Sequence, residues 1–212
     1  MSVNLDQFLY FAGLAGVAVF AISGALAAAE KNLDILGFIL FATVTGVGGG
    51  TLRDLILGVD VFWVAHPIDL QVCVAAGVGT YFLAAQFLAR KRLRRSLLWA
   101  DAMGLALFSV LGTAKAYSIG VDPLIACTMG MMTATFGSVI RDILSDREPV
   151  LLEPEIYVTA ALAGALSYLL LSHWIANENA ALLLAMLMAF LVRASAMVFD
   201  LRLPKFGNRH LS

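Results

Sequence analysis

A glycine-rich motif followed by an Arg-Asp pair occurs twice in the chain, at residues 46–54 and 136–142. The first copy reads Gly-Val-Gly-Gly-Gly-Thr-Leu-Arg-Asp and the second reads Phe-Gly-Ser-Val-Ile-Arg-Asp. The two copies align at an offset of 88 residues, so that Gly49 corresponds to Gly137. Glycines weaken a helix and charges are costly in an apolar segment. Two such motifs in one register therefore indicate a duplicated structural unit.

The composition places both motifs in a membrane. The chain of 212 residues is 61% hydrophobic and 14% charged, whereas a soluble domain has about 45–50% apolar and about 25% charged residues. The excess of apolar residues predicts that side chains face lipid. The formal net charge of −1 gives no reason to expect a nucleic-acid partner.

The apolar segments predict an all-α membrane protein with a single transmembrane domain over residues 1–212. A bilayer core of about 30 Å needs roughly 20 apolar residues per helical crossing. Seven segments meet this requirement, at about 5–29, 35–58, 68–88, 97–117, 123–144, 156–171 and 180–199. The first segment is longer than a signal-peptide core and lacks a basic leader, so we expect it to be retained.

The basic residues predict the orientation of these seven spans. With the cluster at 90–95 on the inside, the outside connections hold no Lys or Arg. The inside connections and the tail then hold Lys31, Arg90, Lys91, Arg92, Arg94, Arg95, Arg147, Arg202, Lys205 and Arg209. Basic residues accumulate on the cytoplasmic side, so we expect the N-terminus outside and the C-terminus in the cytoplasm.

The duplication extends beyond the glycine motif. Three further pairs share its offset, namely Ala18 with Ala106, Phe20 with Phe108 and Gly24 with Gly112. We expect repeat one at about 5–89, repeat two at about 97–172, and a seventh helix at about 180–200 that stands outside both. Because each repeat has three spans, the second copy enters the membrane from the opposite side. Such inverted repeats place a permeation or substrate site at their interface, near interrupted helices.

The glycines of the second and fifth segments are the predicted site. Each glycine inside a helix costs about 1 kcal/mol relative to alanine. A bend at the glycines would leave carbonyls that are tolerated only beside protein or water, and carbonyls in such a place can replace the hydration shell of a cation. The predicted ion path comprises Gly48, Gly49, Gly50, Thr51, Thr135, Gly137 and Ser138, with a transient monovalent cation at Gly48, Gly49 and Gly137. The alternative is close helix packing, for which small residues are typical.

The two Arg-Asp pairs are the second candidate feature. Neighbouring residues on a helix point about 100° apart, so we expect no easy pairing within either pair. Pairing across the repeats, Arg53 with Asp142 or Arg141 with Asp54, is the alternative. Either the charges stabilise the fold or they contact the permeant species.

Three further charges lie in the fourth and seventh segments. Asp101 is expected at an interface, Lys115 is expected either to reach water or to line and gate a pore, and Arg193 is expected to reach inside water or lipid headgroups. The sequence indicates no additional buried carboxylate in the first, third or sixth segment, which disfavours proton coupling.

Enzymatic chemistry is not indicated. The glycine cluster lacks the Gly-Lys-Ser/Thr of a phosphate loop. The histidines His66, His173 and His210 are dispersed, and the cysteines Cys73 and Cys127 are expected as buried free thiols. We therefore expect no metal site, no cofactor and no catalytic residues.

Together these stretches resemble the prokaryotic branch of the TRIC family, the trimeric intracellular cation channels. The likeness covers about residues 5–200 and is carried by 46–54, Val61-Phe62-Trp63, Pro67, 101–108, 112–116 and 140–142. The resemblance implies a homotrimer in the lipid of a prokaryotic inner membrane. It also implies a cation path through each subunit beside kinked second and fifth helices, with potassium as the permeant ion and sodium second.

One departure and one rival remain. The second copy reads Phe136-Gly137-Ser138 where the first has three glycines, which predicts a milder bend. The same prokaryotic sequences also resemble a domain family labelled as glycine transporters. The alternative to a channel is therefore a secondary transporter of a small zwitterion such as glycine, whose charged ends broken helices can bind.

Overall fold

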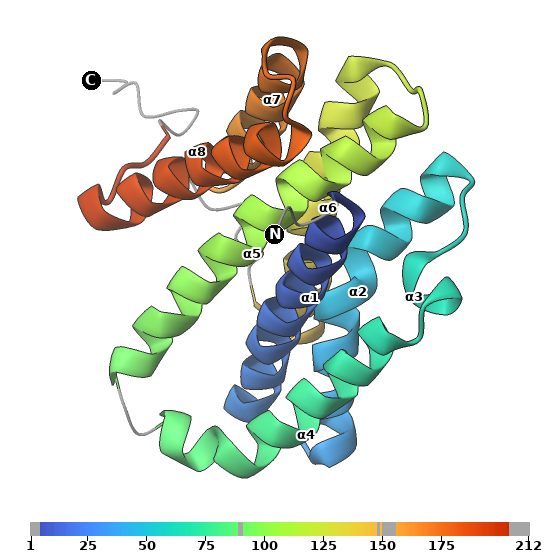
Figure 1. The fold of residues 1–212 in the computed structure, drawn as a ribbon. Helices are drawn as coiled ribbons and strands as arrows, with labels where there is room; N and C mark the ends of the chain where they lie inside the picture. The colour runs from blue at the N-terminus through green and yellow to red at the C-terminus, as the bar shows by residue number, and fades with distance from the viewer. Residues whose placement is uncertain (1–4, 89–90, 148, 150–155, 204–212) are drawn as a thin grey trace, which may run out of the picture.

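The computed structural model describes residues 5–88, 91–147, 149 and 156–203, which form a bundle of helices (Figure 1). The helices, in chain order, are α1 Leu5–Glu30, α2 Ile35–Leu57, α3 Phe62–Ala65, α4 Ile68–Leu88, α5 Lys91–Ser118, α6 Pro123–Leu144, α7 Val158–Trp174 and α8 Glu178–Phe199. The all-α prediction is confirmed. Each of the seven predicted segments overlaps one long helix, and the short α3 was not predicted.

Two long helices begin where an aspartate precedes them. The Asp34 carboxylate accepts a hydrogen bond from Gly37 N at 2.8 Å, and Asp122 accepts one from Leu124 N at 2.8 Å. A carboxylate in this position satisfies a free backbone N–H of the first turn. Pro123, at the first position of α6, has no N–H to satisfy.

The chain is a membrane protein. Four of the described helices are long and apolar enough to cross a bilayer, over Gln7–Glu30, Ile35–Leu57, Pro123–Leu144 and Glu178–Phe199. Shorter apolar helical stretches occupy Ile68–Ala84 and Val158–Trp174. Helix α5 begins at Lys91 rather than at the predicted residue 97, because the basic cluster continues the helix. Of the basic residues used to predict orientation, Arg90, Lys205 and Arg209 lie outside the described residues.

The helices pack in two groups that meet where α2 packs against α6 and where α1 packs against α5. Helix α1 packs against α2 and α4, while α5 packs against α6, α7 and α8. Figure 1 shows α5 crossing the molecule between α1 and the α7–α8 pair. Helices α2 and α6 are in extensive contact, so the two glycine motifs face each other in the interior.

Residues that are 88 positions apart make reciprocal contacts where α1 meets α5. The Phe20 and Phe108 rings stack on each other with centroids 5.4 Å apart and planes 23° apart. A Cβ on Gly16 would lie 3.0 Å from the Phe108 ring, and a Cβ on Gly104 would lie 3.0 Å from the Phe20 ring. In each half of the chain, a glycine at the corresponding position therefore leaves space for the corresponding phenylalanine ring of the other half.

The crossing of α2 and α6 shows the same reciprocity. A Cβ on Gly49 would collide with the Thr133 carbonyl oxygen, and a Cβ on Gly137 would collide with the Thr45 carbonyl oxygen. The later position in α2, Gly49, meets the earlier position in α6, and the later position in α6, Gly137, meets the earlier position in α2. The two helices therefore run antiparallel. Both motifs need glycine because the two backbones touch.

The helices are continuous through their glycines. Residues 35–57 and 123–144 are helical throughout. Neither motif therefore ends its helix, and the close packing that was the alternative is observed. A bend at the glycines is compatible with a continuous helix and stays a prediction.

Candidate functional site

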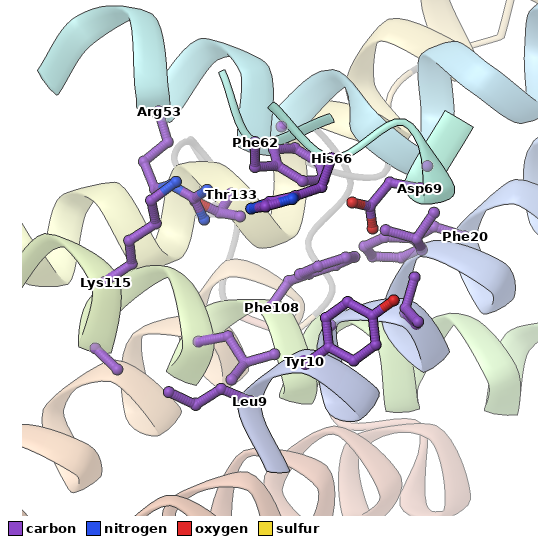
Figure 2. Close-up of a pocket in the computed structure, with 18 of the residues that line it drawn as sticks. Leu9, Tyr10, Phe20, Arg53, Phe62, His66, Asp69, Phe108, Lys115 and Thr133 are labelled. Atoms are coloured by element: carbon purple, nitrogen blue, oxygen red, sulfur yellow. The ribbon is translucent and has the colours of Figure 1, made fainter. Parts of the chain in front are cut away.

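A cavity of about 540 Å³ lies beside this crossing, between α1, α2, α5 and α6, with α3 and the start of α4 on its rim (Figure 2). Much of its wall is apolar, including Leu14, Val17, Phe20, Phe108 and Leu111. Its polar lining includes Thr45, Arg53, His66, Asp69, Lys115 and Thr133. An apolar cavity with a few convergent polar groups is the usual form of a binding site or pathway in a helical membrane protein.

A group of residues that bind the Asp54 carboxylate, which we call the cavity cluster, lies at this cavity. It comprises Arg53, Asp54, Phe62 and Lys115. The Asp54 carboxylate is fully buried and lies 2.7 Å from an Arg53 guanidinium nitrogen and 2.8 Å from Lys115 Nζ. The Phe62 N–H donates to the same carboxylate at 3.0 Å. Asp54 therefore joins α2, α3 and α5.

A second group, the buried cluster, surrounds the other Arg-Asp pair. It comprises Ser23, Asp101, Ser138, Arg141, Asp142 and Tyr157. Arg141 Nε donates to Asp142 at 2.8 Å, and its terminal nitrogen lies 2.6 Å from Ser23 Oγ and 3.3 Å from Asp101. This terminal nitrogen joins α6 to α1 and α5.

The expectation that a neighbouring Arg and Asp do not pair easily is wrong, and the alternative of pairing across the repeats is not observed among the described residues. Each arginine pairs with its own neighbouring aspartate, and neither Arg53–Asp142 nor Arg141–Asp54 is formed. The side chain of arginine is long enough to curve back across the roughly 100° that separates neighbouring residues on a helix. Polar contacts between the halves come instead from Lys115 to Asp54, from Arg141 to Ser23 and from Arg147 to Glu30.

Tyr157 completes the buried cluster. Its hydroxyl donates to Asp101 at 3.0 Å and lies 3.2 Å from Ser138 Oγ. The Arg193 guanidinium lies 5.0 Å from the Tyr157 ring centroid, which is cation–π distance. Asp101 is thus paired inside the bundle rather than at a simple interface. Arg193 is 5% exposed and does not reach water or headgroups as predicted, because this ring and the Ile156 carbonyl receive it.

The predicted glycines take different places around the crossing. Gly49 and Gly50 line the cavity. Gly48 faces the other helix, where its Cβ would lie 3.3 Å from Ile140 Cδ1. Gly137 also lies at the crossing, against the Thr45 backbone, and is not part of the cavity wall among the described residues.

The predicted hydroxyls are held by neighbouring groups. Thr51 Oγ1 donates to the Val47 carbonyl at 2.7 Å and accepts from Trp63 Nε1 at 2.8 Å, which fastens α3 to α2. Thr135 donates to the carbonyl of Met131 at 2.9 Å, and Ser138 donates to that of Thr135 at 2.7 Å. Within the described part of the chain, none of these three side chains lines the cavity.

Two cavity residues were missed from the sequence. Asp69 is 8% exposed and lines the cavity, so the prediction of no further buried carboxylate in the third segment is wrong. An aspartate in the first turn of a helix resembles an ordinary N-terminal charge, which concealed it. The available signal was its spacing of four residues from Cys73, because residues four apart share one face of a helix. The Cys73 sulfur faces Gly46 of α2, so this face of α4 is buried. Thr45 Oγ1 is buried without a hydrogen-bond partner among the described residues.

The fold and the site define a class of protein. The chain is a helical membrane protein whose halves make reciprocal contacts, with a polar-lined cavity and charges buried between its helices. Polar and charged groups at such positions mark pathways or binding sites for small solutes.

Comparison with known proteins identifies the family. The sequence profile described as "Glycine transporter" matches the chain twice, at residues 10–85 and 98–173, and the chain belongs to this family. It is 37% identical over 203 residues to the "UPF0126 inner membrane protein YadS" of Escherichia coli K12, covering 95% of this chain and 97% of that protein. It is 32% identical over 197 residues to the "UPF0126 membrane protein YvgT" of Bacillus subtilis, covering 92% and 94%.

Solved structures confirm the resemblance predicted from the sequence. The TRIC trimeric intracellular cation channel orthologue from Rhodobacter sphaeroides is 43% identical, with a TM-score of 0.86 over 92% of this chain and 100% of that chain. A second structure, described as a TRIC cation channel, is 31% identical with a TM-score of 0.85 over 95% and 98%. The predicted match to prokaryotic TRIC channels therefore holds over nearly the whole chain.

Proposed function

We propose that this protein is a passive, non-enzymatic channel for monovalent cations, permeable to potassium and secondarily to sodium, with one path through each subunit of a homotrimer. The observation that carries the proposal is the cavity ending at the antiparallel crossing of α2 and α6. The solved relative at 43% identity is itself described as a trimeric cation channel, which supports both the ion class and the trimer.

The charges around the cavity favour cations. Its lining holds the cationic Arg53 and Lys115 and the carboxylates Asp69 and Glu178, and Asp54 adds a third carboxylate beside the cations. With His66 neutral, the formal sum is one negative charge. A cavity with low-dielectric walls focuses such a charge and raises the local concentration of cations.

The proposed path runs from the cavity past Thr45 and Thr133 to the crossing, and then along the buried cluster. Gly48, Gly49 and Gly137 are the points at which a transient cation would pass between the helices. Because the two backbones touch there, this arrangement is closed, and conduction requires α2 and α6 to separate. Separation would turn the hydroxyls of Thr135 and Ser138 toward the path.

The proposed topology has seven spans, with α1, α2 and α4 forming one repeat and α5, α6 and α7 an inverted copy. The family profile matches once in each half. The antiparallel course of α2 and α6, which occupy corresponding places, is what inversion requires. The Lys115–Asp54 pair brings together the end of α5 and the end of α2. The Arg147–Glu30 pair brings together the residues after α6 and the end of α1. If the seven spans cross the membrane in alternate directions from an N-terminus outside to a C-terminus in the cytoplasm, the two members of each ion pair lie on the same side of the membrane.

A secondary transporter of glycine is the second candidate, favoured by the description of the family and by one feature of the cavity. Arg53 and Lys115 approach each other on one side of it, whereas Asp69 lies toward the other (Figure 2). Separated cationic and anionic groups can bind the two ends of a zwitterion.

Recording from the purified protein in planar bilayers under a potassium chloride gradient separates the two candidates. Unitary currents that reverse near the potassium equilibrium potential are expected for the channel. Electrical silence, together with saturable glycine uptake into liposomes of the same preparation, would overturn the channel in favour of the transporter.

A further inference from the structure

Two carboxylates beside the cavity differ in how they are neutralised. Asp54 receives Arg53, Lys115 and the Phe62 N–H. Asp69, by contrast, is 8% exposed and forms no ion pair or hydrogen bond with another side chain among the described residues; its own backbone N–H and the nearby His66 are the groups that act on its carboxylate. Burial of a carboxylate without a countercharge is costly, and such groups are normally paired or bind a cation.

The placement of Asp69 follows from its helix face. Asp69, Cys73 and Gly77 recur at the four-residue spacing of one face of α4, and this face packs on α2. The Cys73 sulfur would lie 2.8 Å from a Cβ on Gly46, and a Cβ on Gly77 would lie 2.9 Å from Ile39 Cα. These backbone-close contacts fix the helix, so Asp69 is held beside the glycine motif. Figure 2 shows its carboxylate directed into the cavity, toward Phe20 and Phe108.

A second polar group in the same cavity lacks a partner. Thr45 Oγ1 is buried and makes no hydrogen bond with any described residue. Its counterpart Thr133, 88 residues later, donates to the Met129 carbonyl at 2.6 Å. The same residue type in the same helical setting therefore bonds to its own helix in one half, whereas in the other half its oxygen faces Gly24 of α1 and has no hydrogen-bond partner among the described residues.

We infer that Asp69 is the anionic element of a monovalent-cation site inside the cavity and is a determinant of cation selectivity. The inference rests on the proposed channel function and gives that pathway a specific residue. The carboxylate supplies one negative charge, and Thr45, which lines the same cavity, has a hydroxyl oxygen without a hydrogen-bond partner among the described residues. One carboxylate at this end of the cavity suits potassium or sodium, because divalent cations need more charged oxygen ligands.

The test compares Asp69→Asn with Asp60→Asn, which removes an exposed carboxylate that does not line the cavity. At low salt, we expect Asp69→Asn to reduce potassium conductance roughly three- to tenfold and to lower selectivity for potassium over chloride. At about 1 M salt, where the Debye length is about 3 Å, the difference in conductance should shrink. Asp60→Asn should behave as the unaltered protein does, and Asp69→Glu should restore selectivity.

A binding measurement separates failure of this site from failure of the channel function. Potassium chloride should raise the thermal unfolding midpoint of the purified protein by about 2 °C relative to N-methylglucamine chloride at equal ionic strength. The rise should vanish in Asp69→Asn and persist in Asp60→Asn. If the unaltered protein conducts while Asp69→Asn matches it in low-salt conductance and selectivity, the inference is overturned. If the unaltered protein is electrically silent but the potassium-dependent rise needs Asp69, the site stands and the channel proposal fails.

Discussion

Asp54 is the residue whose surroundings depend most on tertiary contacts. Its carboxylate accepts from Arg53, Lys115 and the Phe62 N–H, which belong to three different helices. Removing a carboxylate from such a group leaves two cations close together at low dielectric, whereas removing one cation leaves a pair.

We therefore expect Asp54→Asn to lower the free energy of unfolding by about 3 kcal/mol, because breaking a buried ion pair costs about 3–5 kcal/mol. Lys115→Met is the matched variant. It should cost about 1 kcal/mol, because the Lys115 side chain is 35% exposed and Asp54 keeps Arg53. Reversible unfolding in mixed micelles measures both. Equal costs for the two variants would contradict the central place given to Asp54.

At this scale the sequence predicts which residues matter better than it predicts their partners. The Arg-Asp pairs and Lys115 were identified because charges in apolar segments are costly. Their pairing depends on how a long side chain curves, which the residue spacing does not decide. Asp69 and Tyr157 were missed because an acid near a helix start and a tyrosine near a membrane boundary are common without any special role.

At the scale of the helices, the crossing of α2 and α6 determines what the glycines do. Long apolar segments predicted the helices well because length and hydropathy are properties of the local sequence. Whether a glycine bends its helix or admits another backbone depends on the partner helix, which local sequence does not reveal. The short α3 depends similarly on Asp54 and on the Thr51–Trp63 hydrogen bond.

Alanine substitutions test this account of the crossing. Gly49→Ala should reduce the free energy of unfolding by about 2 kcal/mol, because its Cβ collides with the Thr133 carbonyl and overpacking typically costs about 1–3 kcal/mol. Gly79→Ala is the control, since no atom lies within 4 Å of its Cβ position, and it should be neutral or stabilising by up to about 1 kcal/mol. Denaturation of both variants in the same micelles gives the comparison. A tolerated Gly49→Ala would mean that the helices do not stay in contact.

At the scale of the whole molecule, the proposed topology makes a labelling prediction. Ile119 follows α5 and Leu201 follows α8, and both side chains are exposed. An impermeant maleimide applied to intact cells should label Ile119→Cys and should label Leu201→Cys only after the membrane is opened. The native Cys73 and Cys127 are buried, so the chain without either substitution should remain unlabelled. Labelling of Leu201→Cys in intact cells would reverse the proposed orientation.

The reciprocal contacts at the crossing have a consequence for how such a chain changes over generations. Suppose that residue i of the first unit touches residue j of the second, and that residue j of the first unit touches residue i of the second. An interface of this kind joins two identical subunits in a symmetric dimer. Gly49 against Thr133, with Gly137 against Thr45, is an arrangement of this kind within one polypeptide. Two copies of one ancestral segment would already have matched each other here before they were fused. After fusion, a larger residue at either glycine requires the opposite helix to move, so the two halves can diverge freely at their surfaces but must change together at their centre.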